Sequence, residues 1–308
     1  MAERQKTSVA KHFKNKEYRS IETVGMNNQG IVAGNITGEQ DGAYLLEFSR
    51  AVVWRHGKMV PLPLFRDMET VAAGINNKGE IAGYGFEQTN DALADTDQAF
   101  LFRRGKITKI GHGRAVCLND HDQVLVQWSD PSAFRIYAKD AGQTVGTPVS
   151  DTYLWNNGTK RPIAVPHGYG NFETFAGINN LGEFAGQIST SHLSRYFSAD
   201  TIGRAFVWRN SKTRVLGTLG GESSKALGIN NNGQVVGKAD VGPPDVHGDE
   251  KTHAFLWQNG RMHDLNGFVS ARSGWVLYSA NGINDKGWIV GMGSKGTFLL
   301  KPIHPHGQ

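Results

Sequence analysis

The chain of 308 residues carries 33 Lys and Arg against 28 Asp and Glu, which gives a net charge of +5, and it has one cysteine. A chain of this length buries about three quarters of its unfolded surface, so it needs neither disulfides nor a structural metal to be stable. The basic N-terminal stretch lacks the apolar core of a signal peptide, and no segment is apolar enough to span a membrane.

We therefore expect a cytoplasmic protein without a membrane partner, secreted only if a leader has been removed. The positive charge comes largely from the N-terminal arm, residues 1–16, and from scattered turns. Lys and Arg form no stripe with interleaved aromatic residues, so nucleic acid is not expected as a partner. Nothing in the sequence indicates an oligomeric state.

Six variants of one pattern follow one another along the chain, each with two short apolar runs joined by a polar turn. They are VGMNNQGIVAG (24–34), AGINNKGEIAG (73–83), VCLNDHDQVLV (116–126), AGINNLGEFAG (176–186), LGINNNGQVVG (227–237) and NGINDKGWIVG (281–291). Asn and Gly tolerate the positive φ of a tight turn, and the flanking Val and Ile favour strands. Each copy therefore predicts a β-hairpin. In the third copy Asp122 replaces the turn Gly, so we expect a strained or reshaped turn there.

A second pattern follows each copy of the first. It reads RAVVWRHGK (50–58), QAFLFRRGK (98–106), DTYLWNNGT (151–159), RAFVWRNSK (204–212), HAFLWQNGR (253–261) and the truncated GTFLLKP (296–302). The Trp that recurs at one strand position predicts packing between neighbouring units. Since no stretch shows a sustained helical period, we predict an all-β chain.

Two hairpins make a four-stranded unit, and the units recur at the roughly 40 to 50 residues typical of propeller blades. We therefore predict a six-bladed β-propeller with four strands per blade. It forms a single domain over residues 17–302, between the basic arm and a C-terminal tail, residues 303–308. The sixth unit stops after its third strand. We expect the N-terminal strand, residues 17–22, to pair with residues 296–300 and complete the last blade, which hides two sheet edges.

The segments HAFLWQNG, GINNNGQVVG and LGTLGG resemble the HAF repeat of bacterial proteins, which is named after its His-Ala-Phe triplet. The resemblance covers nearly the whole chain and implies propeller-like repeats. It implies no common activity and no set of catalytic residues. Only His253 preserves the His of the triplet, and the third copy is degenerate.

Alternation of strands places the tight turns on one rim of the propeller, here called the turn rim, and all other connections on the opposite rim, the loop rim. The connections between second and third strands are long. They are residues 35–49, 84–97, 127–150, 187–203 and 238–252. Long insertions on one rim of a rigid scaffold are typical of a binding or catalytic face, so we expect a functional funnel at the loop rim.

The candidate site residues lie in these connections or just before each Gly-Ile-Asn triplet, where every blade contributes to the mouth of the channel. Groups suited to acid–base chemistry are His112, His167, Arg114 and Tyr278. Groups suited to ligand binding by charge or aromatic contact are Glu22, Glu173, Lys225, Trp128, Tyr137, Tyr169, Tyr196 and Trp275. Ordinary solvated strand ends are the alternative interpretation.

One insertion, DVHGDEKTH at residues 245–253, mixes nitrogen and oxygen donors. Its Asp245, His247, Asp249 and His253 are candidate ligands for a divalent metal ion. The spacing matches no established metal motif, so a solvated acidic loop is the alternative. The predicted fold requires no cofactor. Cys117 replaces a small packed residue of the other copies, which predicts an inert, structural thiol.

We predict a ligand-binding propeller that holds a small molecule, glycan or peptide in the loop-rim funnel. The alternative is an enzyme, a lyase, hydrolase or cyclase, that uses His, Arg and Tyr side chains in the same funnel. A scaffold for protein partners is a third hypothesis. The chain has no nucleophile elbow, phosphate-binding loop or strong metal motif, but acid–base residues scattered over loops leave no linear motif. The hypotheses therefore stay open at the level of the sequence.

Overall fold

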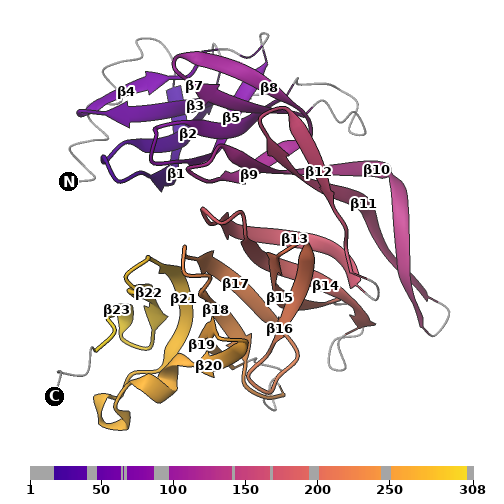
Figure 1. Cartoon of the computed structure of the whole chain (residues 1–308), viewed down its shortest axis with the longest axis vertical. Helices are drawn as coiled ribbons and strands as arrows, with labels where there is room; N and C mark the ends of the chain where they lie inside the picture. Colours follow the sequence, from indigo (N-terminus) through magenta and orange to yellow (C-terminus); the bar gives the residue numbers. More distant parts are fainter. Residues whose placement is uncertain are drawn as a thin grey trace. The chain divides into compact units, whose positions relative to one another are not determined.

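The computed structural model describes residues 17–39, 47–63, 65, 68–86, 97–140, 143–166, 169–193, 201–243 and 251–303. Within these residues the chain forms six antiparallel sheets whose strands are ordered as in the sequence (Figure 1). We call these sheets blades 1 to 6. They fall into two compact units: residues 1–132 with 151–163, and residues 133–150 with 164–308.

The first unit contains blades 1 to 3. Blade 1 consists of β1 (Glu17–Met26), β2 (Val32–Glu39), β3 (Glu47–Arg55) and β4 (Lys58–Pro61). Blade 2 consists of β5 (Glu69–Ile75), β6 (Ile81–Phe86), β7 (Gln98–Arg103) and β8 (Lys106–His112). Blade 3 consists of β9 (Arg114–Leu118), β10 (Gln123–Asp140), β11 (Gln143–Asn156) and β12 (Thr159–Ile163).

The second unit contains blades 4 to 6. Blade 4 consists of β13 (Tyr169–Ile178), β14 (Phe184–Leu193), β15 (Thr201–Arg209) and β16 (Lys212–Gly217). Blade 5 consists of β17 (Ser224–Ile229), β18 (Val235–Asp240), β19 (Thr252–Gln258) and β20 (Arg261–Asp264). Two short 3₁₀ turns, η1 (Leu265–Phe268) and η2 (Ala271–Ser273), lead to β21 (Leu277–Ile283), β22 (Ile289–Gly293) and β23 (Gly296–Leu300) of blade 6. The described residues contain no helix long and apolar enough to cross a membrane.

The turn between the first two strands has the same geometry in every blade. Its Gly adopts the left-handed conformation, with φ of 76° at Gly79 for example. Asp122 holds the equivalent position in blade 3 with φ of 62°. The turn is therefore not reshaped there. A residue with a Cβ occupies a conformation that favours Gly, and Asp tolerates it better than most residues do.

The first strand of every blade has a one-residue bulge, because two of its residues oppose one residue of the second strand. The bulged residues are Val24, Ala73, Val116, Ala176, Leu227 and Asn281. The bulge brings the first strand close to the Gly that ends each repeat. A Cβ on Gly83 would lie 2.1 Å from the carbonyl oxygen of Val71. This contact explains why the repeat ends in Gly in five of the six copies.

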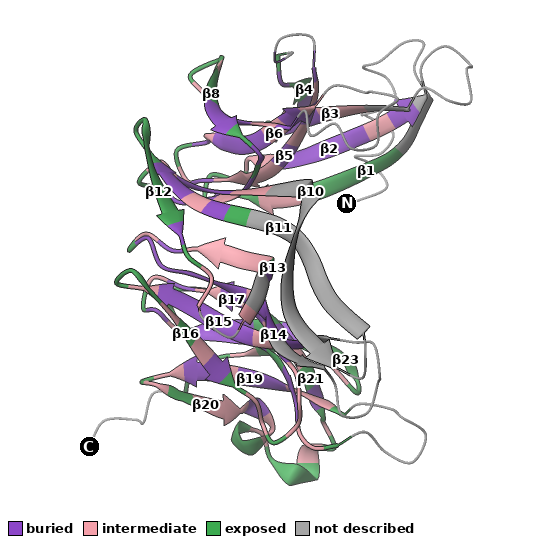
Figure 2. Cartoon of the chain, turned by 90° about the vertical axis from the view of Figure 1, so that its right-hand side faces the viewer, coloured by how far each residue is buried: buried purple, intermediate pink, exposed green. Residues whose placement is uncertain are grey.

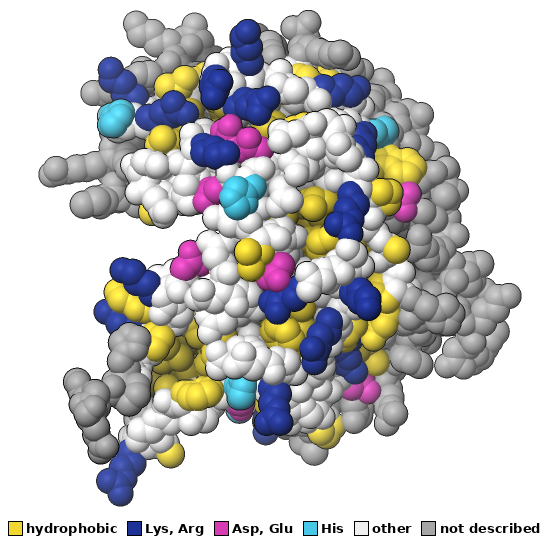
Figure 3. Space-filling view, in the orientation of Figure 1, with side chains coloured by type: hydrophobic (Ala, Val, Ile, Leu, Met, Phe, Trp, Pro, Cys, Tyr) yellow, Lys and Arg dark blue, Asp and Glu magenta, His cyan; other side chains and the backbone are white. Residues whose placement is uncertain are grey.

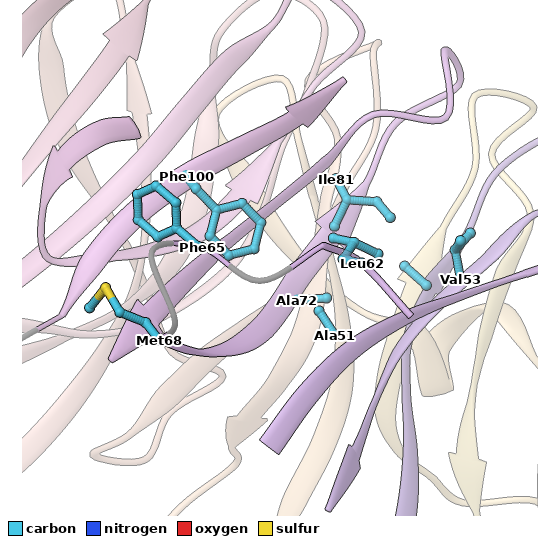
Figure 4. Close-up of a cluster of buried hydrophobic side chains, with 9 residues drawn as sticks. Ala51, Val53, Leu62, Phe65, Met68, Ala72, Ile81 and Phe100 are labelled. Carbon is cyan, nitrogen blue, oxygen red and sulfur yellow. The ribbon is translucent and has the colours of Figure 1, made fainter. Parts of the chain in front are cut away.

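The hydrophobic core lies between neighbouring blades of each unit. Figure 4 shows the layer between blades 1 and 2, where Ala51 and Val53 meet Ala72, Ile81 and Phe100. Figure 2 shows that buried residues follow the strands, while outer strands such as β12 are largely exposed.

The expected role of the recurring Trp is confirmed at two positions. Trp155 of blade 3 packs against residues of blade 2 that include Leu101, and Trp257 of blade 5 packs against residues of blade 4 that include Val207. These bulky rings fill the space between adjacent sheets, where branched and small side chains from both blades meet them.

Two expectations about strand pairing differ from the structure. Residues 17–22 belong to β1 and pair with residues 35–39 of β2, where Ser20 and Thr37 also share a 2.7 Å hydroxyl contact. Within the described residues blade 6 has three strands, so its completion by the N-terminal segment is not seen. Residues 127–150, expected as a connection, continue the strands β10 and β11 on both sides of residues 141–142.

Candidate functional site

The loop rim of blades 2 and 3 brings several of the sequence-predicted residues together within the first unit. Arg114 begins β9, the first strand of blade 3, and His112 ends β8, the last strand of blade 2. Only Gly113 separates them, and its backbone N–H donates to the carbonyl of Asp97 at 2.9 Å. The short connection between the two blades therefore places a cationic and an imidazole side chain at one junction.

Arg114 is held by a carboxylate and an aromatic ring. Its Nε lies 2.5 Å from Oδ2 of Asp97, and its guanidinium lies 5.0 Å from the centre of the Tyr84 ring. Burial raises the pKa of Tyr84, the Arg114 charge opposes that shift, and the charges of Asp97 and Glu22 add to it. The predicted residue Glu22 on β1 therefore lies near enough to influence the same ring. The arrangement fixes a planar cation at the rim.

His112 lies beside a second aromatic residue. Its ring meets the Trp128 ring edge-on at a centroid distance of 5.5 Å. Its backbone carbonyl accepts a 2.9 Å hydrogen bond from the hydroxyl of Tyr153, and Lys160 lies over the Tyr153 ring at 4.8 Å. Burial raises the pKa of Tyr153 to about 12, so this hydroxyl stays protonated and keeps donating at neutral pH.

Two polar atoms at this junction are shielded from water and unpaired in the described part of the chain. They are the Nε1–H of Trp128 and Oε1 of Gln98. Gln98 is the register partner of His112 across β7 and β8, and Trp128 contacts the His112 ring. A buried donor on the ring that contacts His112 and a buried acceptor on its strand partner thus belong to the same junction. Each costs free energy unless a ligand or water satisfies it.

The second unit has its own polar residues at the loop rim. Burial raises the pKa of Glu173, and the positive charge of Lys225 in the next blade opposes the shift. Burial likewise lowers the pKa of Arg204, which the negative charges of Glu222 and Asp240 counteract. The backbone N–H of Ser223 donates a 2.7 Å hydrogen bond to the carboxylate of Asp240. This contact holds the connection between β16 and β17, which contains most of the LGTLGG segment. These charged residues therefore interact with one another where blades 4 and 5 meet.

Two aromatic residues predicted for ligand binding differ in their surroundings. Trp275 is partly buried and packs against the core of blade 6 around Leu277 and Phe298. Tyr278 remains 44% exposed on β21. Trp275 is therefore mainly a packing residue, whereas Tyr278 is available to solvent in its unit.

His253, the described member of the predicted metal set, has a structural partner. Its Nδ1 lies 2.7 Å from Oδ2 of Asp264, which also accepts a backbone hydrogen bond from Asn266 as the cap of η1. Asn266 in turn exchanges two hydrogen bonds with the backbone of Leu277 in blade 6. No group of three or more potential metal ligands occurs in the part of the chain that the structure describes.

Several predicted residues lie outside the described part. These are His167, Tyr196, Asp245, His247 and Asp249, together with the side chain of Tyr137. Their roles stay predictions.

The sequence analysis missed Asp97, Gln98 and Arg204. Gln98 and Arg204 share one signal, since both hold the polar position that precedes the Ala-Phe pair of the second repeat pattern, where His253 stands in blade 5. The structure places this position at the loop-rim end of each third strand. The Ala and Phe that follow are buried core residues, as Ala254 and Phe255 illustrate. The first residue of the triplet therefore varies with the local polar contacts of its blade.

Comparisons with solved structures place this architecture among known folds. The β-propeller domain of the Trilobed protease from Pyrococcus furiosus is 10% identical, with a TM-score of 0.50 over 92% of this chain and 81% of that one. An acylaminoacyl peptidase in complex with Z-Gly-Gly-Phe-chloromethyl ketone is 11% identical, with a TM-score of 0.53 over 92% of this chain and 44% of that one. The chain has a β-propeller fold. Pyrococcus horikoshii acylaminoacyl peptidase gives a TM-score of 0.52 at 11% identity, over 94% of this chain and 46% of that one.

The propeller thus spans less than half the length of these two acylaminoacyl peptidase chains. A family model described as a protein of unknown function (DUF3466) matches residues 196–298. This span contains the segments that resemble the HAF repeat, and that relationship stays a prediction. No curated protein matches the chain. Because propellers support both binding and catalysis, the shared fold carries no activity with it.

Proposed function

We propose that the propeller binds a glycan at the loop rim of blades 2 and 3, in the cluster formed by Tyr84, Gln98, His112, Arg114 and Trp128. The observation that carries the proposal is the pair of shielded polar atoms, Trp128 Nε1–H and Gln98 Oε1, which have no partner within the described residues. A sugar hydroxyl both donates and accepts hydrogen bonds, so it suits a site that offers one donor and one acceptor.

The surrounding groups favour a glycan over the other two ligand classes, a peptide or another small molecule. Aromatic rings at the junction offer faces and edges to the apolar side of a sugar ring, as Tyr84 and Trp128 do. The Arg114 charge is already balanced by Asp97, so a neutral ligand does not leave an unpaired charge behind.

The test is a titration of the full chain with a panel of neutral and acidic oligosaccharides and short peptides, followed by saturation-transfer NMR. We expect oligosaccharide signals to respond. Trp128→Phe keeps the ring and removes the Nε1–H, and Arg114→Gln removes the cation. Each variant should weaken binding about tenfold, the cost of one hydrogen bond to a neutral or charged group.

Arg261→Gln, at the exposed first residue of β20 in blade 5, is the matched control and should bind as the native chain does. Binding of peptides alone would contradict the glycan assignment. Oligosaccharide binding that survives both substitutions at full strength would contradict the location.

The enzyme alternative requires His112, His167, Arg114 and Tyr278 to act together. Within the first unit, His112 packs on Trp128 and Arg114 is paired with Asp97, which suits a fixed binding platform. Among the contacts of the described residues none favours proton transfer over binding, so the glycan-binding proposal stands as the conclusion.

We further propose that residues 17–302 form one six-bladed propeller. The support is the recurrence of the same bulge and turn in all six blades, since identical blades stack in the same way on their neighbours. Scanning calorimetry tests this proposal. One transition whose calorimetric and van't Hoff enthalpies agree is expected, and two separate transitions would contradict it.

A further inference from the structure

A cavity of about 550 Å³ opens at the turn rim of the first unit, opposite the loop rim. It lies between the outer hairpin of blade 1, β3 and β4, and the two turns of blade 2. Val53, Val60, Leu62 and Phe102 line its apolar part. Its charged lining consists of Arg55, Lys78, Glu80 and Arg104. Its volume falls within the range typical of small-molecule sites.

The apolar floor of the cavity is continuous with the core between blades 1 and 2. Val53 and Leu62 appear among the packed side chains in Figure 4 and are 4% and 2% exposed. Val60 pairs with Val53 across β3 and β4, yet it is 50% exposed. The cavity opens above Val60. An apolar ligand group placed there would remove this surface from water.

The charge of the cavity is unbalanced. Lys78 is paired with Asp122 of blade 3 at 2.7 Å, and Glu80 accepts a 2.8 Å hydrogen bond from Asn76. Arg55 and Arg104 have no hydrogen bond or ion pair in the described part of the chain. Figure 3 shows Lys and Arg side chains gathered over the first unit with fewer acidic ones between them. Apart from the paired Lys78, the lining therefore holds two guanidinium groups and one carboxylate, that of Glu80.

The equivalent junction between blades 4 and 5 is filled and neutralised by the chain itself. Arg209, which corresponds to Arg55, donates to Glu183 at 3.1 Å and to the carbonyl of Gly233 at 3.2 Å. Arg214 pairs with Val207 as Val60 pairs with Val53, and its guanidinium lies 5.4 Å from the centre of the Trp257 ring. The junction thus contains both an acid for the first Arg and a long side chain over the ring.

Blade 1 lacks both elements. Ile31 stands four residues after Asn27, at the position that Glu183 holds after Asn179, so Arg55 loses its carboxylate. Val60 replaces Arg214, so the space over Phe102 stays open. Two substitutions within an otherwise repeated framework therefore create a cavity and leave a cation unpaired in it.

We propose that this cavity is a second ligand site, which binds a small carboxylate with an aromatic or aliphatic body. The carboxylate takes the place of Glu183 and pairs with Arg55 and Arg104, since guanidinium and carboxylate groups form strong bidentate hydrogen bonds. The apolar body covers Val60 and Phe102, as Arg214 covers Trp257 in the other unit. The site is independent of the glycan proposed for the loop rim.

The experiment uses para-trifluoromethylbenzoate as the probe and fluorine NMR of the full chain as the readout. We expect saturable broadening or shift of the probe signal, and at least about tenfold weaker binding of the neutral para-trifluoromethylbenzamide. Val60→Arg rebuilds the filled junction of blade 4 and should abolish binding. Arg55→Gln and Arg104→Gln should each weaken it severalfold, and together they should abolish it.

Arg261→Gln, at the exposed first residue of β20 in blade 5, is the matched control and should leave the affinity unchanged. Melting curves report whether each variant is folded. If Val60→Arg does not fold, the Arg55→Gln, Arg104→Gln double variant decides. The proposal is overturned by an absence of binding up to about 10 mM, beyond the affinity range of a useful fragment site. Equal binding of benzoate and benzamide, or undiminished binding to the folded variants, overturns it as well.

Discussion

The side-chain amide of Asn27 in blade 1 donates a 3.2 Å hydrogen bond to the backbone carbonyl of Asn76 in blade 2. Asn76 makes the same contact with Asn119 of blade 3 at 3.1 Å. In the second unit, Asn179 reaches Asn230 in the same way at 3.0 Å. In these blades the first Asn of the repeat therefore joins its own blade to the next one in the same unit.

The second residue of the Asn-Asn or Asn-Asp dipeptide in each repeat adds another link between blades. The backbone N–H of Asn28 donates to Oδ1 of Asn77 at 3.0 Å, and that of Asn77 donates to Oδ1 of Asp120 at 2.7 Å. The carbonyl oxygen of the side chain is the group that accepts, and Asn and Asp both provide one. This shared acceptor explains why the second position is Asn in some blades and Asp in others.

Replacing Asn27 by Ala should destabilise the protein by about 2 to 3 kcal/mol. The change removes the bond to Asn76 and also the Oδ1 acceptor for the backbone N–H groups of Gln29 and Ile31. Asn28→Ala is the matched control, since that side chain is exposed, and should cost less than about 0.5 kcal/mol. Urea unfolding of both variants measures the difference. Equal losses would show that the side chain of the first Asn has no special role.

Gly83→Ala should be more damaging than an ordinary Gly to Ala change. The new Cβ would lie 2.1 Å from the carbonyl oxygen of Val71 and 2.8 Å from the Phe100 ring, and the bulged strand cannot move away without breaking its pairing with β6. We expect a loss of about 3 kcal/mol, at the upper end of overpacking costs. Gly267→Ala, where no non-neighbouring atom lies within 4 Å of the new Cβ, should be near neutral. Urea unfolding of both variants measures the difference in the free energy of unfolding.

The repeated part of the structure could be predicted from the sequence because its rules are local. Turn Gly and Asn residues, β-branched runs and a recurring Trp each act within one hairpin or between adjacent blades. Residues 73–83 alone contain the signal for β5, its turn and β6. One change inside the pattern, Asp122 in place of Gly, does not reshape the turn and puts a residue with a Cβ in the left-handed conformation.

The functional contacts could not be predicted in the same way. The pairing of Arg114 with Asp97 joins residues from two blades, and only the register of β7 and β9 decides that they meet. The cavity at Val60 could not be predicted from blade 1 alone. It follows from a comparison with blade 4, where Arg214 occupies the equivalent position and covers the Trp257 ring. Residues 17–22 extend β1 and pair with β2. Their expected pairing with residues 296–300 stays a prediction, because a strand has two edges and the sequence does not state which sheet the second edge joins.

The pair formed by His253 and Asp264 predicts a specific dependence of stability on pH. Burial alone would raise the pKa of Asp264, but hydrogen bonds from His253 and Asn266 outweigh it and hold this pKa below the ordinary 3.8. The ionised carboxylate therefore contributes stability above pH 3.8, and the contribution is lost as pH falls through the lower folded pKa.

Asp264→Asn should flatten the acid limb of the stability profile between about pH 4 and pH 2, measured by urea unfolding at each pH. Asp151→Asn, at an exposed position within β11, is the control and should leave that limb as it is. An acid limb that Asp264→Asn does not alter would show that this carboxylate is not stabilised by its neighbours.

The thiol of Cys117 predicts the opposite behaviour at alkaline pH. Removal from water raises its pKa from 9.0 to about 12, because the thiolate is poorly solvated between the sheets. In the unfolded chain the thiol ionises first, so folding loses stability as pH rises above 9.0 and the loss is complete near the folded value of about 12. The slope contributed by this one proton is at most about 1.4 kcal/mol per pH unit. Cys117→Ala should remove that slope from urea unfolding curves between pH 9.0 and about 11, while the tyrosines act equally in both proteins.

At pH 8, a thiol reagent should label the native chain far more slowly than the unfolded chain, since only the thiolate reacts. Equally fast labelling of both states would mean that the thiol is open to solvent.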